Sequence, residues 1–259
     1  MFIGRESELN FLEERYSSNK GELVVLYGRR RVGKTETLKQ FCKDKPHLFF
    51  SCRECTDKLQ LKNFSEKLLK EKIPASAYIS EFTDWEKAFR SITELPYGEK
   101  KKLVVIDEFP YMCKGNESIP SVLQNLWDDL LKDENIMLIL CGSAMSFIEK
   151  ELLAEKSPLY GRATGIYKMT EMGFYDAAKF FPDYSPKDVF STPCKKTGND
   201  RDFFYTFGYK DNYNTTCKRS NNTDYPSRIS SYSQFEPISI QRQQNPDHHA
   251  HTCDISLIR

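Results

Sequence analysis

Five short runs of apolar residues recur along the first part of the chain, each long enough for one buried β-strand. Polar residues do not alternate with apolar ones in these runs, which is typical of strands covered on both faces in a parallel sheet. The runs are residues 23–27 (LVVLY), 47–52 (HLFFSC), 103–106 (LVVI), 136–141 (IMLILC) and the shorter 165–169 (GIYKM).

Between these runs, apolar residues recur every three or four positions, the spacing of an amphipathic helix. The predicted helices are residues 6–16, 34–43, 59–72, 85–95, 122–131 and 147–153. Strands that alternate with helices predict an α/β fold. We expect three layers, α/β/α, around a mostly parallel five-stranded sheet joined by right-handed crossovers.

The character of the chain changes after residue 190. From Ser191 to Arg259 there is no valine or methionine, Glu236 is the only glutamate, and polar residues dominate. So little aliphatic surface cannot offset the entropy of ordering about 70 residues. We therefore expect a folded domain at residues 1–190 and a poorly structured tail at 191–259. The tail is either naturally disordered or translated out of frame in place of an original C-terminal region, and the abrupt change favours the second.

Composition and charge exclude several classes of protein. A formal net charge of +1 over 259 residues gives no argument for binding to nucleic acid or to an anionic membrane. No segment approaches the roughly 20 apolar residues of a membrane span, and the N-terminus lacks a signal-peptide pattern. The scattered cysteines fit a reduced, cytoplasmic protein. Cys52 and Cys55 form a close pair, and two ordinary thiols explain them better than a zinc or redox site.

The most informative motif directly follows the first strand. Residues 28–35 read GRRRVGKT, the G-x-x-x-x-G-K-T pattern of a phosphate-binding loop between a strand and a helix. Lys34 is placed to reach the β- and γ-phosphates, and Thr35 to bind Mg²⁺. The helix that begins near Lys34 adds the positive end of its dipole. We expect a nucleoside triphosphate to contact Gly28, Arg29, Arg30, Arg31, Val32, Gly33, Lys34, Thr35 and Glu36.

The third strand ends in two adjacent acids, Asp107 and Glu108. Because the carboxyl ends of parallel strands meet at one edge of the sheet, Asp107 is expected in the same crevice as the phosphate loop. Its expected role is to hold Mg²⁺, through a water molecule, opposite Thr35. Glu108 is expected to polarise a water molecule for in-line attack on the γ-phosphate. The alternative is a plain strand end whose acids face solvent.

Two further positions are candidates for catalysis. Ser143 follows the fourth strand, where its hydroxyl can hydrogen-bond the attacking water or the γ-phosphate; the alternative is an N-cap for the next helix. Arg162 lies in the loop before the fifth strand. It either stabilises transition-state charge at a γ-phosphate, in the same chain or in a neighbour, or is a solvated surface arginine. The three arginines of the phosphate loop similarly add positive potential or project into solvent.

The loop, the strand that ends in Asp-Glu and the strand that ends in a small polar residue together resemble the AAA+ class of P-loop ATPases. Residues 2–9 (FIGRESEL) are similar to the F-x-G-R-x-x-E-L segment of the STAND-related archaeal and bacterial ATPases, where it packs beside the nucleotide base. Residues 27–35 and 103–109 resemble the loop and metal strand of that family, and residues 157–162 (SPLYGR) a further segment. The resemblance implies Mg²⁺-dependent hydrolysis of ATP to ADP and phosphate, coupled to conformational change.

Members of that family continue into a lid of helices, usually a winged-helix module, and a further C-terminal domain. Residues 173–190 fit the start of the lid, whereas the remainder is absent or scrambled, as in a C-terminally truncated or frame-shifted member. ATP and ADP are the expected ligands, since no guanine-reading N-K-x-D motif occurs. A protein or DNA partner would bind through the missing region, and an oligomer is compatible with the pattern. A nucleotide-dependent interaction switch with negligible turnover and a remnant without function are the alternatives.

Overall fold

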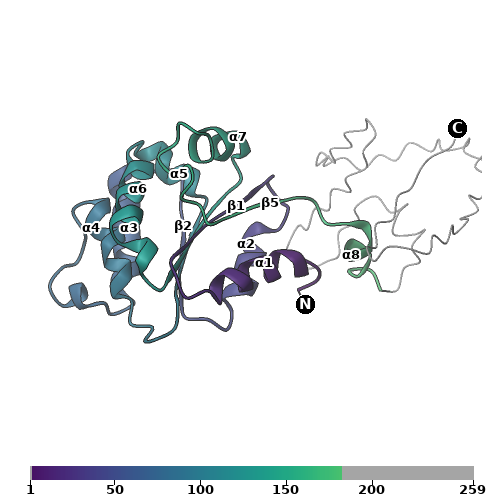
Figure 1. The fold of residues 1–259 in the computed structure, drawn as a ribbon, viewed down its shortest axis with the longest axis horizontal. Helices are drawn as coiled ribbons and strands as arrows, with labels where there is room; N and C mark the ends of the chain where they lie inside the picture. The colour runs from purple at the N-terminus through teal and green to yellow at the C-terminus, as the bar shows by residue number, and fades with distance from the viewer. Residues whose placement is uncertain (1, 183–259) are drawn as a thin grey trace, which may run out of the picture. The chain divides into compact units, whose positions relative to one another are not determined.

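The computed structural model of the chain describes residues 2–182 (Figure 1). The expected tail at 191–259 and the second half of the expected lid segment, residues 183–190, lie outside the described residues. Among the helices of the described part, none combines the length and apolar composition needed to cross a bilayer.

Within residues 2–182, five strands form one fully parallel sheet in the order β2-β3-β4-β1-β5. This confirms the predicted α/β fold, and each strand lies within one residue of its expected bounds. The order places β4 between β1 and β3, so the carboxyl ends of these three strands are neighbours. The strands are β1 (Glu22–Gly28), β2 (His47–Ser51), β3 (Lys102–Asp107), β4 (Ile136–Gly142) and β5 (Gly165–Met169).

Helices cover both faces of the sheet and complete the three layers (Figure 1). Since successive strand residues point to opposite faces, Val24 and Leu26 of β1 belong to the core beneath α1 and α2, whereas Leu23 and Val25 belong to the other core. The first face carries α1 (Glu6–Tyr16) and α2 (Lys34–Cys42); the second carries α3 (Asp57–Leu69), α4 (Trp85–Arg90), α5 (Phe109–Gly115) and α6 (Ile119–Asp129).

Short helical segments fill the connections. The structure contains the 3₁₀ turns η1 (Pro74–Ala77), η2 (Ser91–Glu94) and η3 (Leu131–Asp133), followed by α7 (Met145–Phe147), the π-helix η4 (Ile148–Leu152) and α8 (Phe174–Ala178). The helix expected at 85–95 therefore changes to a 3₁₀ turn after Arg90, and the one expected at 147–153 divides between α7 and η4. Helix α5 was not predicted. Helix α6 begins before its expected start, because Pro120 occupies the first turn, where a missing N–H costs no hydrogen bond.

Candidate nucleotide-binding site

The loop between β1 and α2 requires glycine at both of its ends. A Cβ atom at Gly28 would collide with the backbone carbonyl of Met169 on the neighbouring strand β5. Gly33, directly before α2, has φ of +91°, and Arg31 also has a positive φ of 69°. The backbone therefore turns tightly into the N-terminus of α2, where free N–H groups and the helix dipole favour an anion.

The Lys34 side chain folds back onto this loop. Its Nζ donates hydrogen bonds to the carbonyl oxygens of Gly28 (2.9 Å) and Arg29 (2.8 Å), and the residue is only 6% exposed. Burial lowers the pKa of the ammonium, and the nearby side chains of Cys141, Glu108 and Asp107 oppose that shift. The ammonium thus lies close to the loop carbonyls and within electrostatic reach of the side chains at the ends of β3 and β4.

Thr35 and Asp107 meet, although 72 positions separate them in the chain. The Thr35 hydroxyl donates to Oδ2 of Asp107 at 2.8 Å, and Oδ1 of Asp107 accepts the backbone N–H of Glu108 at 3.0 Å. Asp107 is 4% exposed. The described residues contain no group of three or more His, Cys, Asp or Glu side chains that could hold a metal ion by themselves. One hydroxyl and one carboxylate fit Mg²⁺, which completes its shell with water and substrate phosphates.

Glu108 has an unusual backbone conformation and a defined partner. Its φ of +53° lies in the left-handed region, a costly conformation for a residue with a side chain, and it precedes helix α5. Its Oε2 accepts hydrogen bonds from the Ser143 hydroxyl (3.0 Å) and the Ser143 backbone N–H (3.3 Å). The N-cap alternative for Ser143 is wrong, because the N-cap of α7 is Ala144, without a side-chain hydrogen bond. Ser143 instead holds the candidate water-activating carboxylate.

The remaining side chains of the loop face outward, with one exception. Arg29, Arg30, Arg31 and Glu36 are exposed, whereas Val32 is buried. Arg29 forms an ion pair with Glu171 (3.6 Å), Arg30 donates to the Tyr111 hydroxyl (3.4 Å), and Glu36 pairs with Lys39 (2.9 Å). The arginines therefore project into solvent in this structure, as one of the two alternatives expected.

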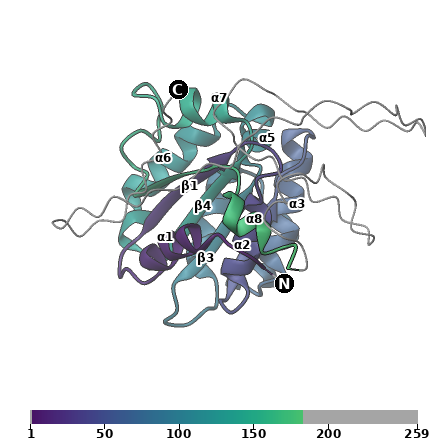
Figure 2. The same cartoon turned by 90° about the vertical axis from the view of Figure 1, so that its right-hand side faces the viewer.

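Arg5 contacts the loop from the N-terminal segment, and no individual role was expected for it. It is buried, has φ of +69°, and donates to the carbonyl of Val32 (2.6 Å) and to Glu8 (2.7 Å). The same segment approaches α8, since a Cβ at Gly4 would contact the Asp176 side chain. In Figure 2, α8 lies beside the N-terminal end of the described chain. The arginine and glutamate spacing of residues 5–8 was visible in the sequence, but its long-range contact with the loop was not.

Arg162 lies toward the opposite end of the sheet from the phosphate loop. It precedes Gly165, which pairs with Val24 near the amino end of β1. From Val24 the strand continues over four residues to Gly28, about 13 Å at 3.3 Å per residue. In this structure Arg162 is therefore remote from the phosphate loop of its own chain.

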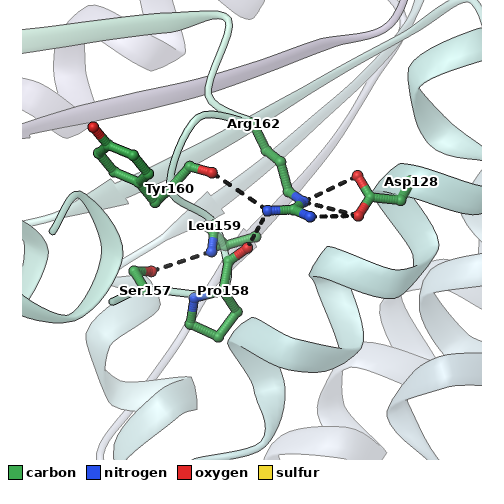
Figure 3. Close-up of polar contacts among 6 residues, drawn as sticks. All are labelled: Asp128, Ser157, Pro158, Leu159, Tyr160 and Arg162. Carbon is green, nitrogen blue, oxygen red and sulfur yellow. Dashed lines mark hydrogen bonds and ion pairs between the residues drawn. The ribbon is translucent and has the colours of Figure 1, made fainter. Parts of the chain in front are cut away.

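Arg162 is also not a freely solvated arginine. Its Nε and Nη2 donate to both carboxylate oxygens of Asp128 at 2.6 to 3.0 Å, and Nη1 donates to the carbonyls of Pro158 (2.9 Å) and Tyr160 (3.3 Å) (Figure 3). Hydrogen bonding by the guanidinium lowers the pKa of Asp128. The arginine therefore ties the loop before β5 to the C-terminal end of α6.

Comparison with known families agrees with this geometry. The model of an ATPase domain that occurs predominantly in Archaea matches residues 2–206. The chain belongs to this family. Membership of this archaeal ATPase family makes the loop at 28–35 part of a nucleotide-binding P-loop domain.

Two relatives of the chain are known by sequence. An uncharacterized protein of Methanocaldococcus jannaschii is 36% identical over 182 residues, which cover 70% of this chain and 38% of that protein. A second protein of that organism, described as an uncharacterized ATP-binding protein, is 53% identical over 45 residues, 17% of this chain and 76% of the relative.

Solved structures share the fold. A Walker-type ATPase of Pyrococcus abyssi has a TM-score of 0.55 at 23% identity, over 73% of this chain and 61% of that one. Drosophila ORC bound to DNA has a TM-score of 0.53 at 16% identity, over 69% of this chain and 46% of that one. The chain thus spans 38% of the first M. jannaschii relative and 61% of the P. abyssi chain.

Proposed function

We propose that this chain hydrolyses ATP to ADP and phosphate in a Mg²⁺-dependent reaction coupled to conformational change. The observation that carries the proposal is the 2.8 Å contact between the Thr35 hydroxyl and the Asp107 carboxylate, with Glu108 next in the chain. A phosphate loop, two oxygen ligands and a second carboxylate then share one site, as phosphoryl transfer to water requires. ATP is proposed rather than GTP because the guanine-reading motif is absent from the sequence.

Each polar side chain has a role in this proposal. Lys34 binds the β- and γ-phosphates in exchange for the loop carbonyls, and Thr35 and Asp107 hold Mg²⁺, which when bound neutralises phosphate charge. Glu108 accepts a proton from the attacking water, and Ser143 positions the Glu108 carboxylate. The backbone of residues 28–36 surrounds the phosphates.

Replacement of Ser143 by alanine tests the positioning role. The variant removes the hydroxyl hydrogen bond to Glu108 and keeps the backbone one, so a loss of about 1.5 kcal/mol is expected. This corresponds to a roughly tenfold lower kcat with unchanged nucleotide affinity. Phosphate release and binding of a fluorescent ATP analogue measure the two quantities. Ser146→Ala, at an exposed position of α7, is the matched control; an unchanged kcat in the Ser143 variant contradicts the role.

A nucleotide-dependent interaction switch with negligible turnover is the second candidate function. In this candidate the two Ser143 hydrogen bonds restrain the Glu108 carboxylate instead of orienting it for water activation, so Ser143→Ala would raise turnover and not lower it. Slow hydrolysis combined with tight partner binding that depends on the bound nucleotide would support the switch.

The same proposal places the chain in the AAA+ class and in its STAND-related branch. It also divides the chain into a domain at 1–190 and a tail at 191–259, with a lid that starts at 173–190. Helix α8 (Phe174–Ala178) is compatible with the first lid helix. A protein or DNA partner is proposed to bind through regions that follow the ATPase domain in longer proteins. The similar fold of a DNA-bound ORC supports DNA as one such partner.

Thermal unfolding of the full chain with and without Mg·ATP tests the proposal. At about 100 times its dissociation constant, a ligand should add roughly 2.7 kcal/mol to the free energy of unfolding. Lys34→Ala should lose this gain, whereas Lys43→Ala, exposed just beyond α2, should keep it. If ATP with EDTA raises the free energy of unfolding as much as Mg·ATP does, the proposed role of Mg²⁺ in nucleotide binding is wrong. The absence of any gain would leave the chain as a remnant without function.

A further inference from the structure

Cys52 and Cys55 occupy a short connection between a strand end and a helix start. Cys52 directly follows β2, and Cys55 directly precedes Thr56, the N-cap of the 13-residue helix α3. Both are free thiols; Cys52 is 5% exposed and Cys55 is partly exposed. The segment thus combines a partly exposed thiol, Cys55, with a buried one, Cys52, directly before a helix.

A buried amide with an unused donor lies beside the two thiols. Gln60 of α3 is 3% exposed, and its Oε1 accepts hydrogen bonds from the Cys55 thiol (3.0 Å) and the Arg53 backbone N–H (3.4 Å). Its Nε2 has no hydrogen-bond partner although it is buried. Burial raises the pKa of the Cys52 thiol, and the neighbouring Gln60 amide opposes that shift. Gln60 therefore adjoins both sulfur atoms, and its hydrogen bonds are incomplete in the dithiol state.

The same connection is attached to the segment that carries the candidate catalytic acids. The backbone N–H of Cys52 donates to the carbonyl of Asp107 at 2.8 Å. Farther along, Glu54 forms an ion pair with Lys114 of α5, and Asn116, just after α5, donates to Asp57 at 3.2 Å. Since α5 begins immediately after Glu108, the Cys52–Cys55 connection contacts this segment near both of its ends.

We propose that Cys52 and Cys55 form a redox-active dithiol whose oxidation to an intramolecular disulfide alters the nucleotide site. The oxidant is a small-molecule disulfide. Cys55 loses its proton to solvent, and its thiolate attacks one sulfur atom of the oxidant and releases a small thiolate. This small thiolate takes the proton of the buried Cys52, whose sulfur then attacks Sγ of Cys55. The second small thiolate leaves and takes a proton from solvent. Two protein thiols and one disulfide give one protein disulfide and two small thiols, so electrons and protons balance.

The effect on the site follows from what the disulfide changes. Bond formation removes the Cys55 thiol from Gln60 and draws Cys55 toward Cys52, on the side of Asp107. We expect Glu54 and Asp57, which contact Lys114 and Asn116, to shift with it. The end of β3 and the start of α5 carry Asp107 and Glu108, so nucleotide affinity is expected to fall about fivefold or more in the oxidised state. This second part rests on the proposed nucleotide-binding function, whereas disulfide formation does not.

The test equilibrates the full chain in mixtures of reduced and oxidised glutathione. Remaining thiols are alkylated and assigned by peptide mass, and amide hydrogen exchange of residues 102–116 is followed together with binding of a fluorescent ATP analogue. The expected result is a Cys52–Cys55 disulfide, faster exchange at residues 107–116, weaker nucleotide binding, and reversal of all three by dithiothreitol. Because the first two readouts need no nucleotide, failure of the proposed function remains distinguishable.

Matched variants separate this pair from the other thiols. Cys52→Ser and Cys55→Ser should abolish the disulfide and the change in exchange, whereas Cys42→Ala, a buried cysteine of α2 on the other face of the sheet, should retain both. A stable mixed disulfide on Cys55 without closure onto Cys52 overturns the proposal. So does a disulfide that forms without any change in the exchange of residues 107–116.

Discussion

Glu108→Gln is expected to lower kcat for ATP hydrolysis by about 10²- to 10⁴-fold while nucleotide binding stays close to native. Glutamine has nearly the same shape as glutamate and keeps an oxygen that accepts the hydrogen bonds of Ser143, but it cannot take a proton from water. Phosphate release under saturating Mg·ATP measures turnover, and the thermal shift with Mg·ATP reports binding.

The control for this change is Glu117→Gln, an exposed glutamate between α5 and α6. It alters the same charge outside the site and should leave turnover unchanged. Full activity of the Glu108 variant would remove Glu108 from the reaction and transfer water activation to another group. A variant that also loses the thermal shift would indicate a disturbed backbone, since the left-handed conformation of residue 108 is sensitive to its surroundings.

Arg162→Ala is expected to slow hydrolysis by about 10³-fold with nucleotide binding intact, the scale of an arginine supplied to phosphoryl transfer by a neighbouring molecule. We propose that Arg162 acts on a nucleotide bound to a neighbouring chain, because the phosphate loop of its own chain is at the other end of β1. Asp128 must release the guanidinium for this contact. Turnover per chain is therefore expected to rise with protein concentration in the native protein and to stay low in the variant.

Mixing two inactive variants gives the sharper measurement. Arg162→Ala chains keep Glu108, and Glu108→Gln chains keep Arg162, so mixed assemblies contain complete sites and should regain activity. Asp128→Ala is the matched control: it breaks the same ion pair but keeps the guanidinium, and its turnover should stay close to native. A lower Tm of Arg162→Ala with unchanged kcat would instead assign Arg162 to anchoring the loop at 157–162.

The sheet was predictable from sequence because its strands are continuous apolar runs, buried on both faces, which have no competing interpretation as helices of that length. Helix α5 was not, since Pro110 breaks the apparent pattern and the seven residues show less than two full periods. Contacts between residues that follow different strands were even harder to predict from the sequence. The partnership of Ser143 with Glu108 depends on β3 and β4 being neighbours, and the distance of Arg162 from the loop depends on the register of β5 against β1.

The strand order has a consequence for how the protein is made. The phosphate loop leaves the ribosome early. The two strands that flank β1 in the sheet are β4 and β5, and both follow more than 100 residues later. Strand β5, whose Met169 carbonyl packs against Gly28, is the last of the described strands to be synthesised. A nascent chain therefore carries an exposed apolar β1 without either neighbour until β4 is made from residue 136 onward, and pairing must close a long loop. If translation stops before residue 169, the phosphate loop lacks the contact between Gly28 and Met169.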